Sequence, residues 1–197
     1  MRKTAIIIWW LSFLLVLIIS ILFQTVFNPR LVDDDGVVLE NLDGRRGGYT
    51  FKEVEQLFID LRKPDAFDFY MNEWQLVDTV YPFALAALFW STIWLACRFW
   101  PVWVRRILWL APMVALVLDL IENHLIRGML YAFKNANLKA EMAATANTMT
   151  LLKWNAYTVN IVFWLILLVV LCIAKWSARN ESAIFSAEQT ADDETAD

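Results

Sequence analysis

The chain has little of what most catalytic and metal-binding motifs require. Its 197 residues include one histidine, two cysteines and five glycines. Because His124 is the sole histidine and no H-E-x-x-H sequence occurs, we predict no zinc or other metal site. Cys97 and Cys172 fall near the same ends of two apolar segments, where thiols stay reduced, so no structural disulfide is expected. We find no established catalytic motif, predict no cofactor, and see no support for nucleic-acid binding.

Apolar residues are abundant instead. They make up 59% of the chain, which contains 11 tryptophans and has a mean hydropathy of +0.48. Four segments, about 5–23, 76–97, 107–126 and 156–174, are each near the ~20 residues that cross a hydrocarbon core. Backbone groups in lipid must be satisfied internally, so each should be helical. We predict an all-α fold: a four-helix transmembrane bundle with an extramembrane amphipathic helix in the first outer loop.

The N-terminal segment resembles a secretory signal, because Arg2 and Lys3 precede it. Its apolar run is longer than the usual central region of such a signal, and no A-x-A-like cleavage site follows. We therefore interpret it as an uncleaved anchor, and we expect this first segment to be peripheral because it carries few polar residues.

Lysine and arginine near the segment ends predict the orientation. The short turn between segments two and three is basic, whereas the first loop, 24–75, is acidic overall. We expect a multi-pass protein of the cell (inner) membrane with both termini cytoplasmic, although Arg127, Lys134, Lys139 and Lys153 of the second outer loop argue the other way. The basic residues assigned to the inner side are Arg2, Lys3, Arg98, Arg105, Arg106, Lys175 and Arg179.

Two regions outside the spans have distinct patterns. In the first loop, Thr50 and Glu53 have the spacing of a capping box that opens a helix over about 51–63. Pro64 then begins a helix that runs into the second span. We predict a single membrane domain over 1–179. The acidic segment 180–197 should be a disordered cytoplasmic tail.

Polar residues of three predicted spans reach a common depth. At about 1.5 Å per residue, Asp119 lies about 20 Å and Glu122 about 24 Å from Arg106, and residues of the second and fourth spans reach similar heights. Asp119, Glu122 and Asn123 share one helix face, and Arg127 should reach back toward the carboxylates. The predicted polar layer consists of Asp78, Tyr81, Asp119, Glu122, Asn123, Arg127, Tyr157 and Asn160.

An acid within a spanning helix costs about 2.5–3.5 kcal/mol on insertion scales, so intramembrane acids are functional candidates. The alternative is that the layer only fastens the helices together by hydrogen bonds. Our leading hypothesis is a non-enzymatic accessory or lipid- or ligand-binding protein, with membrane lipids and another membrane protein as partners.

A second hypothesis is a membrane-embedded enzyme that modifies a lipid or isoprenoid. Asp119 and Glu122 would exchange the proton as catalytic residues, Asp78 and Tyr81 would complete the pocket, and Asn160 would orient it. A third is a proton or cation pathway, which is least favoured because the inner half of every span lacks a matching polar relay. As a separate alternative, Asp78, Asp119 and Glu122 are geometrically conceivable ligands of a hard cation. The enzyme hypothesis needs a cavity open to lipid at the acid layer, with carboxylates aimed into it. The binding or scaffold hypothesis predicts a closed, mutually hydrogen-bonded cluster without a void.

Three short motifs carry a resemblance: GGYTFKEV at 47–54, DTVYP at 78–82 and DLIEN at 119–123. Together they resemble an uncharacterised family of small four-span bacterial integral membrane proteins. The resemblance covers about 42–130 and implies the four-span architecture without an activity.

Overall fold

A computed structural model describes residues 2–33, 35–62, 64–97 and 100–195 of the chain. This part is helical and contains no strand, only an isolated bridge between Val32 and Val38. The α-helices are α1 (Arg2–Leu22), α2 (Phe51–Asp60), α3 (Pro64–Phe69), α4 (Gln75–Ala96), α5 (Val102–Lys134) and α6 (Ala140–Thr195). A π-helical turn and a 3-10 turn extend α1 to Arg30, and a second π-helical turn, Tyr70–Trp74, joins α3 to α4.

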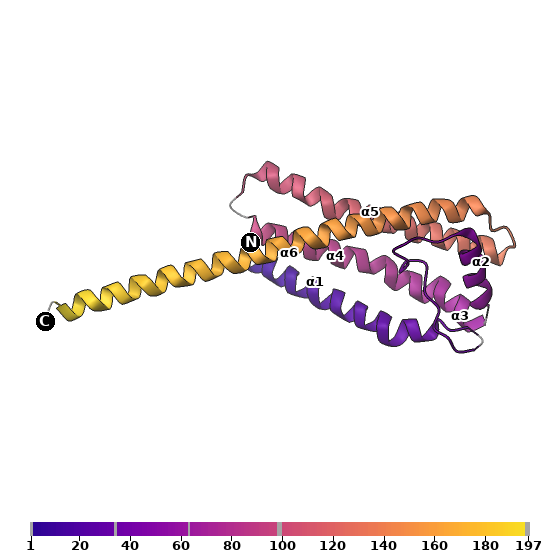
Figure 1. The fold of residues 1–197 in the computed structure, drawn as a ribbon, viewed down its shortest axis with the longest axis horizontal. Helices are drawn as coiled ribbons and strands as arrows, with labels where there is room; N and C mark the ends of the chain where they lie inside the picture. The colour runs from indigo at the N-terminus through magenta and orange to yellow at the C-terminus, as the bar shows by residue number, and fades with distance from the viewer. Residues whose placement is uncertain (1, 34, 63, 98–99, 196–197) are drawn as a thin grey trace.

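The four long helices lie side by side, and α2, α3 and the irregular segment 31–49 gather at one end, which we call the capped end (Figure 1). Helix α4 packs against α1, α5 and α6, and α5 packs against α6. Three helical stretches are long and apolar enough to cross a membrane: Lys3–Arg30, Ala66–Ala96 and Ala140–Ile173. The chain is therefore an all-helical protein with the features of a membrane protein.

The outer faces of the long helices are apolar. Leu11 of α1, Leu110 of α5 and Val169 of α6 are among many large hydrophobic side chains that are more than half exposed in the isolated chain. A continuous apolar surface of this kind is unfavourable in water. It fits lipid, whereas Thr92, Asp119 and Asn160 are among the polar side chains of the same helices that are buried.

Helix α2 forms as its sequence pattern predicts. The Thr50 N–H donates to Glu53 Oε2 at 2.6 Å, and the Glu53 N–H donates to Thr50 Oγ1 at 3.4 Å, which completes the capping box. Val54, Leu57 and Phe58 on its apolar face are buried in the core of the capped end. That core also includes parts of segment 31–49, α3, α5 and α6.

Helices α5 and α6 are longer than the apolar segments that predicted them. Helix α6 begins at Ala140, whereas the predicted apolar segment begins near 156. The additional turns contain polar residues such as Thr145, Asn147 and Thr150, so they were not part of the apolar segment. At the other end α6 continues to Thr195, where the sequence predicted a disordered tail from Asn180. Alanine, glutamate and glutamine in that segment favour a helix, and Figure 1 shows it extending beyond the other helices.

Candidate functional site

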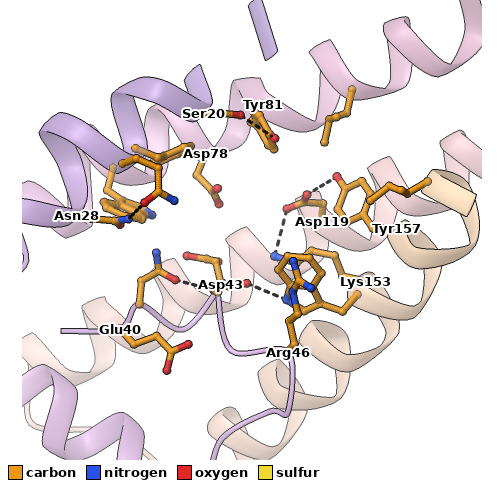
Figure 2. A pocket seen from close by; sticks show the side chains of 18 of the residues that line it. Ser20, Asn28, Glu40, Asp43, Arg46, Asp78, Tyr81, Asp119, Lys153 and Tyr157 are labelled. Atoms are coloured by element: carbon orange, nitrogen blue, oxygen red, sulfur yellow. Dashed lines mark hydrogen bonds and ion pairs between the residues drawn. The ribbon is translucent and has the colours of Figure 1, made fainter. Parts of the chain in front are cut away.

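A cavity of about 680 Å³ lies at the capped end, between α1, α4, α6 and segment 31–49. Its wall combines aromatic and aliphatic side chains with carboxylates and two bases (Figure 2). The lining residues are Ser20, Phe23, Gln24, Asn28, Val38, Leu39, Glu40, Asn41, Asp43, Gly44, Arg46, Trp74, Asp78, Tyr81, Leu85, Phe89, Asp119, Lys153, Trp154, Tyr157 and Ile161. Three of them, Asp78, Tyr81 and Asp119, belong to the two motifs DTVYP and DLIEN.

The centre of the polar layer is a buried ion-pair network. Lys153 Nζ of α6 lies 3.8 Å from Asp119 Oδ1 and forms a second ion pair with Glu122 Oε2, both from α5. The side chains of Lys153, Asp119 and Glu122 are 5%, 6% and 0% exposed. One turn of helix separates the two acids, so a single ammonium group can reach both. The chain itself thus supplies the cation between these carboxylates.

Two hydroxyl groups of α6 complete the network. Tyr157 Oη donates to Asp119 Oδ2 at 2.5 Å, and Thr150 Oγ1 donates to Glu122 Oε1 at 2.5 Å. The Tyr49 hydroxyl lies 3.2 Å from the same Thr150 oxygen. Hydrogen bonds to a charged acceptor are stronger than neutral ones, so these hydroxyl groups offset part of the cost of burying two acids. Burial raises the pKa of the Tyr49 hydroxyl above its ordinary value.

Asp78 differs from the other two acids. It lies on α4, lines the cavity, and has no hydrogen bond or ion pair to another described residue; its Oδ2 is buried. Figure 2 shows its carboxyl group pointing into the space between the helices. One turn further along α4, the Tyr81 hydroxyl lies 3.2 Å from Ser20 Oγ of α1. A buried carboxyl oxygen without a donor is costly, and Asp78 as a residue is only half-buried. Asp78 is therefore the polar group of the wall most available to a ligand.

Segment 31–49 forms the outer side of the cavity and is attached to α6. Trp154 Nε1 donates to the Asp43 carbonyl oxygen at 3.0 Å, and the Tyr49 N–H donates to Asn147 Oδ1 at 2.8 Å. The Asp43 side chain is itself buried, with its Oδ2 within 3.4 Å of the Tyr70 hydroxyl. Burial raises the pKa of Asp43, and the positive charge of Lys153 opposes this effect.

Three predicted residues take positions apart from the ion-pair network. Arg127, expected to reach the carboxylates, instead donates from Nη2 to the Gln75 carbonyl oxygen at 2.7 Å and to Thr79 Oγ1 at 3.0 Å. It therefore fastens α5 to α4, because its side chain extends toward the start of α4.

Asn160 also bonds to backbone, donating to the carbonyl oxygens of Ala111 at 3.1 Å and Ala156 at 2.8 Å. Asn123 is buried, and its amide makes no hydrogen bond to a described residue. Neither residue lines the cavity. His124 is exposed.

Several residues of this region are not among the predicted residues of the polar layer. Lys153 shares a helix face with Tyr157 and Asn160, but it was counted with the basic residues of an outer loop. That spacing was the available signal, because a lysine one turn from an intramembrane tyrosine can pair with an acid at the same depth. Asp43 had no periodic signal, because it lies in an irregular segment. The first span was expected to be peripheral, yet α1 and its extension contribute Ser20 and Phe23 to the cavity.

Among the described residues, no group of three or more histidine, cysteine, aspartate or glutamate side chains could hold a metal ion. The hard-cation arrangement of Asp78, Asp119 and Glu122 is therefore not formed, and Lys153 lies at the carboxylates instead. No protein-family model, curated protein or solved structure matches the chain. Function must accordingly be argued from the cavity and its residues.

Proposed function

We propose that the chain is a four-span protein of the inner membrane, with both termini cytoplasmic and the capped end outside. Besides the three apolar stretches, α5 supports this topology: its 33 residues extend about 50 Å. It packs against α4 and α6, and Ile107, Met113 and Val117 on its outer face are exposed. Arg105 and Arg106 lie near the opposite end from the cap, which favours a cytoplasmic position for that end. Arg98 lies outside the described residues.

Within this topology, the protein binds an amphipathic, lipid-like molecule. The cavity carries this proposal, because its volume of about 680 Å³ falls in the range of small-molecule sites. Leu85, Phe89 and Ile161 provide an apolar wall, and Asp78, Asp119 and Tyr157 provide a polar one. This cavity departs from the closed, void-free cluster that the binding or scaffold hypothesis predicted, and the proposal is revised accordingly to a ligand-binding protein. The ligand's chain would lie against the apolar wall and its polar end against the acids.

A membrane-embedded enzyme acting on a lipid or isoprenoid is the second candidate. The observation that favours it is the position of Asp78, a carboxyl group without a partner, on the same cavity as the Tyr157–Asp119 hydrogen bond. Acid–base chemistry needs two such groups within reach of one bound molecule. Glu122 is less suited than Asp78, because it is fully buried and does not line the cavity. A proton pathway is less favoured, because it would need further polar groups to carry the proton beyond the acids. Thr92 lies further along α4, but its hydroxyl oxygen already accepts hydrogen bonds from two tryptophans.

The binding proposal can be tested by filling the cavity. Leu85 lines the cavity from α4, whereas Leu76 on the same helix is exposed on the outside of the bundle. Wild type, Leu85→Trp and the matched control Leu76→Trp would be extracted gently with their lipids. Native mass spectrometry would then compare the retained species.

We expect a retained amphiphile in the wild type and in Leu76→Trp, and its loss in Leu85→Trp with thermal unfolding little changed. Equal retention by Leu85→Trp, or a wild type that retains nothing, would overturn the proposal.

A further inference from the structure

The charges around the cavity are unevenly matched. Its lining contains four acids, Glu40, Asp43, Asp78 and Asp119, but only two bases, Arg46 and Lys153. Lys153 is already shared by Asp119 and by Glu122 behind the wall. One positive charge cannot neutralise all the carboxylates that lie around it.

Two of the acids are also incompletely bonded. Asp78 has no partner among the described residues, and Oδ1 of Asp43, a residue that is 7% exposed, accepts no hydrogen bond. Figure 2 shows Asp43, Asp78 and Asp119 around one common space. Buried acceptors without donors are costly, and a bound group with N–H donors would satisfy them.

The wall between these acids is aromatic. Phe23, Trp74 and Tyr81 line the cavity next to Asp78, and Trp154 and Tyr157 line it on the side of Asp119. The faces of such rings attract cations. The chain already uses this property, because the guanidinium group of Arg46 lies 4.5 Å from the centre of the Trp154 ring.

We infer that the ligand is an amphiphile whose polar end carries a protonated amine, and that this amine pairs with Asp78 inside the aromatic wall. The inference rests on the proposed function and specifies its ligand class. An anionic polar end fits less well, because it would meet Asp43, Asp78 and Asp119 while Lys153 is engaged by two carboxylates. Glu40 does not add to this imbalance, because it is exposed and pairs with Arg45. A neutral polar end could bond to Asp78 but would supply no positive charge to pair with its carboxylate form.

The test compares three amphiphiles with the same chain length and different polar ends: hexadecylamine, hexadecanol and hexadecanoate. Each would be added at equal concentration to the purified full chain in uncharged maltoside micelles, and native mass spectrometry would count the bound molecules. The variants are Asp78→Asn, which removes the charge, and Asp78→Glu, which keeps it. Glu55→Gln is the matched control, because Glu55 is exposed on α2 and does not line the cavity.

We expect hexadecylamine to bind at least about tenfold better than hexadecanol in the wild type, in Asp78→Glu and in Glu55→Gln. Asp78→Asn should lose this preference while its thermal unfolding stays cooperative. If the three amphiphiles bind equally, the amine inference is wrong and the binding proposal stands. If none binds, both fail. If Asp78→Asn keeps the full preference, the assignment to Asp78 is overturned.

Discussion

Removing the Lys153 ammonium group should destabilise the protein more than removing any exposed cation. In Lys153→Met the apolar stem is largely retained, but Asp119 and Glu122 lose the charge that they share. Breaking a buried ion pair by removing one partner typically costs about 3–5 kcal/mol, because the other charge stays buried and unpaired. For a chain of this size, that corresponds to a fall of about 6–20 °C in the unfolding temperature.

Lys134→Met provides the matched control. Lys134 pairs with Asp68 at 3.3 Å, but the two side chains are 53% and 57% exposed. Water screens such a pair, and its loss should cost less than about 1 kcal/mol. Both variants would be compared with the wild type by equilibrium unfolding in mixed maltoside and dodecyl sulfate micelles, with helicity followed by circular dichroism.

A combined variant separates charge from packing. Adding Asp119→Asn and Glu122→Gln to Lys153→Met replaces the ions with neutral groups of similar shape, so most of the lost stability should return. The stabilising role of Lys153 is contradicted if Lys153→Met is no more destabilising than Lys134→Met. It is also refuted if the combined variant is less stable than Lys153→Met alone, because then the carboxylates would be stabilising without their cation.

Two further predictions concern segment 31–49. Burial raises the pKa of Asp43 above its ordinary 3.8, so the folded chain holds this proton more tightly, and wild-type stability should fall as pH rises through and above that value. Asp43→Asn has no titrating group at this position and lacks this loss. Thermal unfolding should therefore show that its unfolding temperature, relative to that of the wild type, increases from about pH 4 to about pH 7. Parallel pH profiles of the two proteins would contradict a raised pKa of Asp43. Gly48 has a φ of +80°, and an added Cβ would collide with the Asn147 side chain. Gly48→Ala should therefore cost at least about 1–2 kcal/mol in thermal unfolding, whereas Gly47→Ala, which meets open space, should cost much less.

The sequence predicted the helical class because its signals are local. Long apolar runs predicted the three helical stretches that are long and apolar enough to cross a membrane, and the Thr50–Glu53 spacing predicted the start of α2. Apolar composition locates only the part of a helix that can contact lipid. It therefore underestimated α5 and α6, whose polar ends continue the helix where they pack against the cap.

The candidate site was predictable only in part, for a related reason. Depth along a helix identified Asp78, Asp119 and Tyr157, because rise per residue is fixed. Depth does not specify direction across the bundle, and Asn160 at the same height bonds to backbone away from the cavity. Asp43 lines the same cavity as Asp78 and Asp119 because of the course that an irregular segment takes in the folded chain. No periodic sequence pattern predicts such a course.

The residues of the polar layer differ in whether their contacts hold the helices together or leave them exposed to the cavity. Glu122 is fully buried, bonded to Thr150 and paired with Lys153, and it does not line the cavity, so its contacts are those of a fastening group. Asp78 has the opposite character: it lines the cavity and has no partner among the described residues. Asp119 belongs to both parts, because it is paired with Lys153 and also lines the cavity. A network that satisfies its own inner charges can hold one further carboxyl group beside the cavity, and that group is then free to select a ligand by charge.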